Sequence, residues 1–523
     1  MVWTRRTFLT RVAAAGGYRA MFTAMQSLGL LAMAEASPLP QLPANYGSGK
    51  QVVILGAGIA GLVSAYELRK AGFECSVLEA RERPGGRSWT VRNGSKVEFT
   101  DGTVQNCDWE GDNYLNPGPA RIPSIHRTIL GYCEELGVPL EVEVNTSRST
   151  LLQSKALNGG RPVEQRQVIN DTRGYVSELL AKSIDQRALD QVLSKDDTER
   201  MLAFLKTYGD LDTDYRYKGS ERSGVDLPPG AGPDVEKIHT PLKLHELLVA
   251  DFSFAELYEE QLDWQATMFQ PVGGMDRIPY AFAESLGNLV HYGSPVQQIR
   301  HTQKGVRVVY MDKSSRAQTI EADYCICTLP ISILDTLDTD FSPAKKQAFR
   351  GMRVAALYKI GWESPRFWEK KYNIYGGISF TDQMVGIVWY PSARLFSKSG
   401  VILSGFGFEK DDFGDGKVNQ FGALSTEEKL AASRAAVETL HPGHGNSLSK
   451  PIYVSWQKIP FSLGCFALNN MPDAKPAYDE LSKPEGRCFI AGDYVSHLAG
   501  WQEGAALSAH RAVMGIAEHM RST

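Results

Sequence analysis

The chain has 523 residues, of which 43% are hydrophobic and 22% are charged, a composition typical of a globular protein with an ample core. Its formal net charge is −4 and it has no basic tract interleaved with aromatic residues, so we expect no nucleic-acid partner. The seven cysteines form no C-x-x-C pair, so neither a disulfide framework nor a metal site is indicated. No apolar stretch reaches the length of a membrane span.

The N-terminus carries a candidate export signal over residues 1–36. Residues 4–9 read TRRTFL, which resembles the twin-arginine motif, and residues 34–36 read AEA, which is typical of a cleavage site. This pattern predicts a bacterial protein exported to the periplasm or the medium. Arg11 and Arg19 interrupt the short apolar region, which leaves the alternative of a retained basic helix on a cytoplasmic protein.

A nucleotide-binding pattern follows a Pro- and Gly-rich linker. An apolar strand at Val52–Leu55 leads into a G-x-G-x-x-G turn, an amphipathic helix at about 59–71 and a second strand at Cys75–Leu78. The glycines and the acid that ends the second strand are Gly56, Gly58, Gly61 and Glu79. The first glycine permits the tight turn, the second lets the backbone approach a pyrophosphate at the helix N-terminus, and the third lets helix and strand pack closely. The acid is placed to accept hydrogen bonds from a ribose.

Helices and strands alternate only in pieces along the rest of the chain. The spacing predicts helices at 125–136, 170–205, 242–265, 426–441 and 504–520, and strands at 290–299, 306–311, 322–329, 354–362, 387–390, 401–406, 452–456 and 488–490. Residues 109–119 and 210–233 are polar and rich in Gly and Pro, which favours loops. We therefore expect a dinucleotide-binding sheet built from separated segments, with another sheet and a helical domain inserted.

Four further motifs indicate which dinucleotide is bound. They are RPGGR at 83–87, PVGGMDRIP at 271–279, CICTLP at 325–330 and FIAGD at 489–493. The arginines can neutralise phosphate, and Asp493 can accept hydrogen bonds from a sugar-like chain. Together with the glycine motif and the later GWQEGAALSA, they resemble the flavin-dependent amine oxidase family, which contains monoamine oxidases and L-amino-acid oxidases. The resemblance runs from about Lys50 to Arg511 and favours FAD over NAD.

The resemblance implies an α/β fold with α+β insertions. A Rossmann-type FAD-binding domain would be assembled from residues 49–105, 269–350 and 484–523, a mixed-sheet substrate-binding domain from 106–165 and 351–483, and a helical domain from 166–268. The residues implied to bind the cofactor are Gly56, Gly58, Ala60, Gly61, Glu79, Ala80, Arg81, Gly86, Arg87, Val296, Gly492, Asp493 and Trp501.

The resemblance also implies a substrate site. Arg121, in PARIP, matches the arginine that holds the substrate carboxylate in L-amino-acid oxidases, and Tyr390, in WYP, matches a tyrosine whose hydroxyl reaches the same carboxylate. Lys359, in ALYKIGW, matches the lysine that hydrogen-bonds through water to flavin N5. Gly500 and Trp501 match the pair beside the flavin ring. Ordinary salt bridges, core packing and snorkelling to the surface are the alternative roles for these side chains.

Two features stay open. Cys465 lies near the position through which monoamine oxidases tether FAD, but amino-acid oxidases generally lack that bond, so we expect non-covalent FAD. His239, His245 and His497 are candidate general bases, and the motifs place none of them.

The residues and the resemblance predict an FAD-dependent L-amino-acid oxidase, expected to be a homodimer or higher oligomer. It would convert L-amino acids, with bulky or aromatic side chains accepted, into 2-oxo acids, ammonia and hydrogen peroxide, by hydride transfer from Cα to flavin N5 and with dioxygen as the acceptor. The alternatives are an amide-forming amino-acid 2-monooxygenase, a monoamine or polyamine oxidase without carboxylate recognition, and an inactive flavoprotein binding module.

Overall fold

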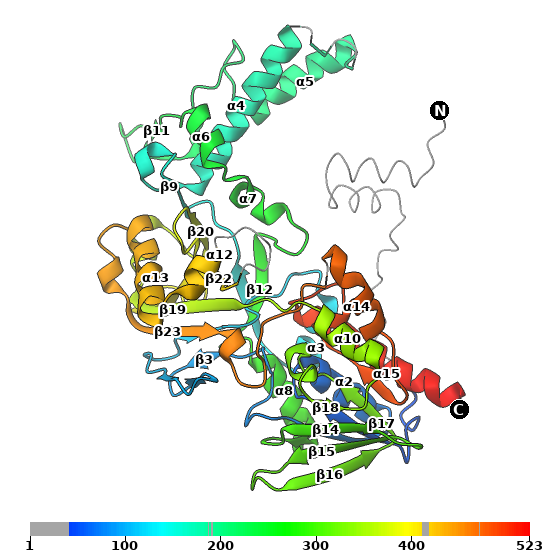
Figure 1. Ribbon diagram of the computed structural model, residues 1–523. Helices are drawn as coiled ribbons and strands as arrows, with labels where there is room; N and C mark the ends of the chain where they lie inside the picture. Colours follow the sequence, from blue (N-terminus) through cyan, green and yellow to red (C-terminus); the bar gives the residue numbers. More distant parts are fainter. Residues whose placement is uncertain (1–40, 187, 190–191, 411–417, 470, 523) are drawn as a thin grey trace.

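A five-stranded parallel sheet forms the base of the molecule in the computed structural model, which describes residues 41–186, 188–189, 192–410, 418–469 and 471–522 (Figure 1). The strands run in the order β13 (Val290–His291), β2 (Glu74–Leu78), β1 (Gln51–Leu55), β17 (Tyr324–Cys327) and β24 (Cys488–Ile490), and all neighbours are parallel. The prediction of a sheet built from separated segments is confirmed. The predicted leader at 1–36 lies outside the described residues.

Helices bury this sheet, as parallel strands require. Helix α2 (Ile59–Lys70) follows β1 directly, and α15 (Gln502–Ser522) packs against α2. All but one residue of β1 and all four of β17 are buried. One hydrophobic cluster joins residues of β1, α2 and α15, so the two ends of the described chain share one core.

A smaller sheet extends from the base in the order β16 (Ala317–Ala322), β15 (Val306–Met311), β14 (Val296–His301) and β18 (Asp338–Thr339). The single strand predicted at 290–299 is wrong, because the structure divides it into β13 and β14. Gly293 takes a positive φ of 63° between them, and Pro295 has no N–H to donate to a ladder.

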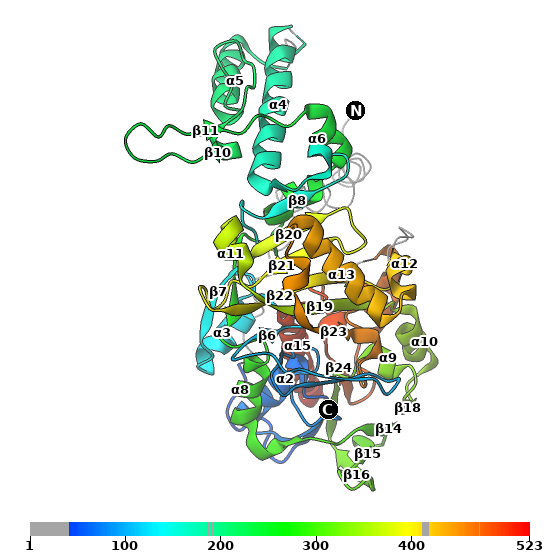
Figure 2. The ribbon, with the colours of Figure 1, turned by 90° about the vertical axis from the view of Figure 1, so that its left-hand side faces the viewer.

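A seven-stranded mixed sheet forms the middle layer (Figure 2). Its order is β23 (Ser449–Ser455), β19 (Leu357–Pro365), β22 (Ser399–Phe408), β21 (Ile387–Tyr390), β20 (Gly377–Thr381), β8 (Leu151–Gln153) and β9 (Val163–Glu164). Helix α13 (Thr426–Leu440) covers one face and begins with a capping box between Ser425 and Glu428. The opposite face is therefore left to line a cavity.

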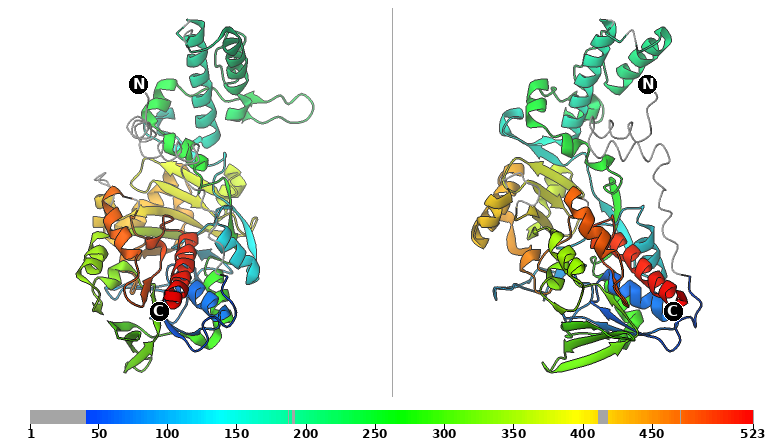
Figure 3. Two further views of the ribbon diagram at one scale, coloured as in Figure 1. Left: turned by 90° about the vertical axis from the view of Figure 1, so that its right-hand side faces the viewer. Right: turned by 45° about the vertical axis from the view of Figure 1, so that its right-hand side comes forward.

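A helical arm projects from this layer on the side away from the parallel sheet (Figures 1 and 3). It holds α4 (Gln165–Asp185), α5 (Lys195–Tyr208), α6 (Leu244–Ala250) and α7 (Ser253–Glu256). The continuous helix predicted at 242–265 is broken where Asp251 takes a positive φ of 47°. Among the described residues, no helix is both long enough and apolar enough to cross a membrane.

The remaining elements connect these layers. They are β3 (Val91–Arg92), β4 (Lys96–Glu98), β5 (Val104–Asn106), β6 (Tyr114–Leu115), α3 (Arg127–Glu135), β7 (Leu140–Val144), β10 (Val225–Leu227), β11 (Lys237–Ile238), β12 (Thr267–Pro271), α8 (Arg277–Leu286), α9 (Ile331–Leu334), α10 (Pro343–Gly351), α11 (Phe367–Tyr372), α12 (Val418–Ala423) and α14 (Lys475–Leu481). The pair β7–β12 is antiparallel and carries the chain from the arm back to the base.

Gly61 and Gly131 provide a matched test of this packing. A Cβ at Gly61 would lie 1.9 Å from the carbonyl oxygen of Gly56, whereas a Cβ at Gly131 on α3 meets nothing within 4 Å. We expect Gly61→Ala to displace α2 and to lower the free energy of unfolding by about 3 kcal/mol or more. Gly131→Ala, at an exposed position of α3, should instead raise the free energy of unfolding by about 0.5–1 kcal/mol. Thermal unfolding at saturating FAD checks the order, and equal melting temperatures for the two variants would contradict it.

Candidate active site

A cavity of about 660 Å³ lies between the parallel sheet, the middle sheet and the segment that follows the arm. The lining includes most of the predicted site residues: Gly56, Gly58, Ala60, Glu79, Ala80, Arg81, Gly86, Arg87, Arg121, Lys359, Gly492, Asp493, Gly500 and Trp501. These residues come from segments spread along the whole described chain. Only the tertiary fold brings them to one surface.

The glycine turn at one end fits a dinucleotide. Gly56 has a positive φ of 97°, and a Cβ at Gly58 would project into open space at the start of α2, whose N-cap makes no side-chain hydrogen bond. The backbone N–H groups of that helix end are therefore available to an anion. Glu79 is 3% exposed, and its carboxylate accepts hydrogen bonds from the N–H of Ala57 at 2.8 Å and of Arg81 at 2.9 Å.

Arg87 and Asp493 bind each other instead of standing free. Nη1 of Arg87 lies 3.2 Å from Oδ2 of Asp493, and Nη2 donates to Oδ1 of the same carboxylate. Oδ2 also accepts from the N–H of Gly500 at 3.0 Å. This pair joins RPGGR to FIAGD, so the two motifs that the sequence assigns to the cofactor hold each other in place. Both side chains still line the cavity.

Two predicted cofactor residues do not line the cavity. Gly61 packs α2 against the turn, which is the role its position in the motif predicts. Val296 is half-buried in β14 and packs against a separate hydrophobic cluster, so its side chain does not reach the cavity. The loop just before it is nevertheless tied to the acid, because the N–H of Ser294 donates to the Glu79 carbonyl oxygen at 2.7 Å.

The middle sheet presents one face to the cavity, and strand alternation decides which side chains it shows. From β19, β21 and β22 the cavity is lined by Leu357, Lys359, Ile387, Trp389, Phe406 and Phe408. Tyr390 points the other way. Its hydroxyl is buried between Ser379 Oγ at 2.9 Å and His441 Nε2 at 2.6 Å. This placement disagrees with the predicted contact between Tyr390 and a substrate carboxylate, because Trp389, one residue earlier, is the side chain that faces the cavity.

Arg121 is 8% exposed and faces the cavity. Its Nη1 donates to Oδ1 of Asn145, and its guanidinium carbon lies 4.7 Å from the ring centroid of Trp389. The rings of Trp264 and Tyr258 lie at 5.6 and 5.7 Å. Within the described part of the chain, no carboxylate forms an ion pair with Arg121 at 4.0 Å or less. A buried cation in this setting favours an anionic ligand.

Lys359 is 3% exposed, and its Nζ donates to the carbonyl oxygens of Asn116 at 2.9 Å and Gly118 at 2.7 Å. Burial, with a smaller contribution from the charge of Arg121, lowers the pKa of Lys359 to about 7. The ammonium is therefore held by backbone dipoles and exchanges its proton in the neutral range.

The histidine candidates lie elsewhere. His239 pairs with Asp226 at 2.7 Å in the arm, and His245 is on α6. His497 packs against Tyr478 with tilted rings whose centroids lie 4.7 Å apart. None of the three candidates lines the cavity. Trp501 does line it and makes an edge-to-face contact with His126, with centroids 4.9 Å apart.

Sequence reasoning missed an aromatic wall. Phe254 on α7 of the arm lines the cavity together with Tyr258 and Trp264, which come after that helix, and Phe461 and Phe466 add to this wall. The helical pattern assigned to 242–265 concealed this wall. The recurring aromatic residues in FAELYEEQLDW are the signal that was available.

The model of the protein family described as "Flavin containing amine oxidoreductase" matches residues 59–517 of this chain. The chain belongs to this family. Its cofactor is accordingly FAD, and the glycine turn, Glu79 and the open space at Gly58 fit the adenosine diphosphate half of that molecule. Because the family consists of oxidoreductases, the protein is assigned to that class of enzyme.

Known relatives cover most of the chain. The L-amino-acid oxidase of Notechis scutatus scutatus is 28% identical over 474 residues, covering 86% of this chain and 84% of its own. The Bacillus subtilis (strain 168) protein YobN, provisionally named an L-amino-acid oxidase, is 27% identical over 486 residues, covering 87% and 92%. The solved structure of cyclohexylamine oxidase from Brevibacterium oxydans IH-35A is 17% identical, covers 90% and 99%, and superposes with a TM-score of 0.59.

Glu79→Ala tests the cofactor end of the cavity. Loss of the carboxylate frees two backbone N–H groups that it holds, so we expect FAD affinity to fall by about tenfold or more. The ratio of flavin to protein absorbance after gel filtration measures this. Glu82→Ala is the matched control, because that side chain is 68% exposed and pairs with Lys313 at the surface. Full flavin content in both variants would contradict the assignment.

Proposed function

We propose that this protein is an L-amino-acid oxidase that releases 2-oxo acid, ammonia and hydrogen peroxide. The observation that carries the proposal is Arg121, a buried cation that faces the cavity and has no carboxylate partner within 4.0 Å in the described chain. An amine without a carboxylate would bring no anion within hydrogen-bond reach of that cation. The amino-acid oxidases among the relatives agree with this choice.

Arg121 binds the substrate α-carboxylate through its planar guanidinium. Asn145 and the face of Trp389 fix the orientation of the guanidinium, because they occupy one of its N–H groups and one of its faces. Tyr258 replaces the predicted Tyr390 as the neighbouring phenol. Burial raises the pKa of Tyr258, and the charge and hydrogen bond of Arg121 oppose that rise.

The remaining side chains orient the substrate and exclude water. FAD, when bound, would supply the acceptor for the hydride of Cα and the route for electrons to dioxygen. The aromatic wall and the apolar face of the middle sheet remove water and accept bulky side chains. The α-amine must be neutral for its lone pair to assist departure of the hydride. Nζ of Lys359, with a pKa of about 7, lines the cavity and can accept or release a proton near neutral pH.

A substrate screen tests the proposal. The twenty L-amino acids and a panel of simple amines are incubated with the holoenzyme, and peroxide and 2-oxo acid are measured. Peroxide with amines alone would overturn the proposal and favour the amine-oxidase alternative, which the fold neighbours putrescine oxidase and cyclohexylamine oxidase represent. Amide in place of 2-oxo acid would identify a monooxygenase. Absence of flavin bleaching under anaerobic conditions would identify an inactive module.

Arg121→Met separates carboxylate recognition from chemistry. Methionine keeps most of the volume and removes the charge-assisted hydrogen bonds, so kcat/KM for L-amino acids should fall by about 10²–10³-fold. Oxidation of an amine with the same side chain but no carboxylate should change little. Arg394→Met, at a 40% exposed side chain outside the cavity, is the control. Equal losses on both substrates would mean that Arg121 is structural.

Cys465 lines the cavity as a free thiol. Burial raises its pKa to about 12, against the opposing charges of Arg87 and Lys359, so the thiolate that covalent attachment requires is disfavoured. We expect acid precipitation to release all FAD into the supernatant. Cys465→Ala should retain wild-type flavin content, and an FAD mass increment on the denatured chain would disprove non-covalent binding.

A further inference from the structure

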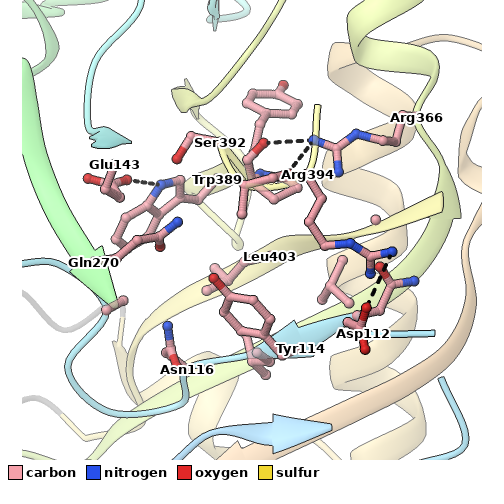
Figure 4. A pocket seen from close by; sticks show the side chains of 18 residues that line it. Asp112, Tyr114, Asn116, Glu143, Gln270, Arg366, Trp389, Ser392, Arg394 and Leu403 are labelled. Carbon is pink, nitrogen blue, oxygen red and sulfur yellow. Dashed lines mark hydrogen bonds and ion pairs between the residues drawn. The ribbon is translucent and has the colours of Figure 1, made fainter. Parts of the chain in front are cut away.

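Glu143 is a buried acid that the cofactor and substrate assignments leave unused. It lies on β7, is 3% exposed, and accepts a hydrogen bond from Nε1 of Trp389 at 3.2 Å (Figure 4). Its other oxygen, Oε2, is buried and has no hydrogen-bond partner among the described residues. A buried carboxylate oxygen without a donor is costly, so its charge must be compensated at longer range or removed by protonation.

Trp389 connects this acid to the substrate site. The indole lines both the large cavity and a small side cavity of about 90 Å³ that Glu143 borders. Arg121 lies over the ring at 4.7 Å from its centroid, and Nζ of Lys359 lies at 5.7 Å. One carboxylic acid and two cationic side chains thus surround one indole. In the described chain the acid makes no ion pair at 4.0 Å or less with either cation.

Other charged groups near Glu143 are already paired or lie outside this cluster. At the far side of the small cavity, Arg366 pairs with Glu369 at 2.6 Å and Arg394 approaches Asp112 at 3.9 Å. From the strands packed beside β7, Gln270 is neutral and donates to Glu141 at 3.0 Å. Tyr114 is a phenol whose pKa is raised by burial and by Glu141 and Glu143. Arg121 and Lys359 are therefore the cations that stabilise the Glu143 carboxylate.

We propose that Glu143 is the internal counter-ion of Arg121 and that it takes up a proton when a substrate carboxylate binds there. This inference rests on the proposed carboxylate site. Two ionised carboxylates beside one buried cation repel each other, which raises the free energy of the doubly ionised state. Binding of the substrate carboxylate therefore favours protonation of Glu143. Glu143 acts through Arg121 and is a positioning residue, separated from the substrate by Trp389.

The substrate ammonium gives up one proton to become the reactive neutral amine, and Oε2 of Glu143 takes up one proton, so the net charge of the site and its ligand is unchanged. Burial raises the pKa of Glu143 to about 7, opposed by Arg121, the Trp389 hydrogen bond and Lys359. Below that pH the acid is already neutral and carboxylate binding is independent of pH. Above it, binding requires proton uptake and weakens as pH rises.

The test uses 3-phenylpropanoate, a carboxylate without an amine, titrated into the holoenzyme by calorimetry in buffers of different ionisation enthalpy. We expect uptake of about one proton per ligand at about pH 8 and little uptake at about pH 6, with Kd rising about fivefold between about pH 7 and pH 8. Glu143→Gln should bind without proton uptake and with a Kd independent of pH. Glutamine still accepts the Trp389 hydrogen bond, so a purely structural role would leave the pH profile unchanged.

Two controls assign the proton. Glu141→Gln, on the same strand two residues away, should keep the wild-type profile. Lys359 is the other group that could take up the proton. Lys359→Met removes it, so proton uptake should persist in this variant if Glu143 is the acceptor. Uptake that persists in Glu143→Gln, or its absence in the wild type at about pH 8, would overturn the inference. Failure of wild type to bind the probe, or equal binding by Arg121→Met, would instead refute the carboxylate site itself.

Discussion

The parallel sheet can be completed only by strands from distant parts of the chain, and the rest of the structure depends on that constraint. Strand β1 needs β17 beside it, and β17 in turn needs β24. The carboxyl ends of parallel strands meet at one edge, where ligands bind in open α/β sheets. The pair between Arg87 and Asp493 ties the first and last of these segments together at that edge. The cavity forms where the segments meet.

Burying cations in that cavity costs solvation free energy, and different neighbouring groups compensate this cost at Lys359 and at Arg121. Lys359 is held by two carbonyl oxygens and shifts its pKa toward neutrality. Arg121 is held by an amide oxygen and aromatic faces, with Glu143 beyond the indole. A site built in this way favours an anionic ligand, because a carboxylate compensates a charge that the protein leaves only partly balanced.

The sequence predicted local motifs and most contacts with the cavity, because glycine turns and strand ends are set by nearby residues. Gly56, Gly58 and Glu79 lie where the motif places them, and Arg121 and Lys359 reach the same cavity. Tyr390 was misplaced because strand alternation makes an error of one residue a change of face. Phe254, Tyr258 and Trp264 were missed because helical spacing does not reveal that positive φ at Asp251 breaks the helix.

The sequence by itself therefore determined the cofactor family and the fold class, since both depend on short motifs whose geometry is local. Only the tertiary structure decided which face of β21 lines the cavity, that Arg87 is bound to Asp493, and that Glu143 shares an indole with Arg121. Those relations join residues separated by up to several hundred positions. No spacing rule reports them, because burial and charge compensation depend on what the folded chain brings within a few ångströms.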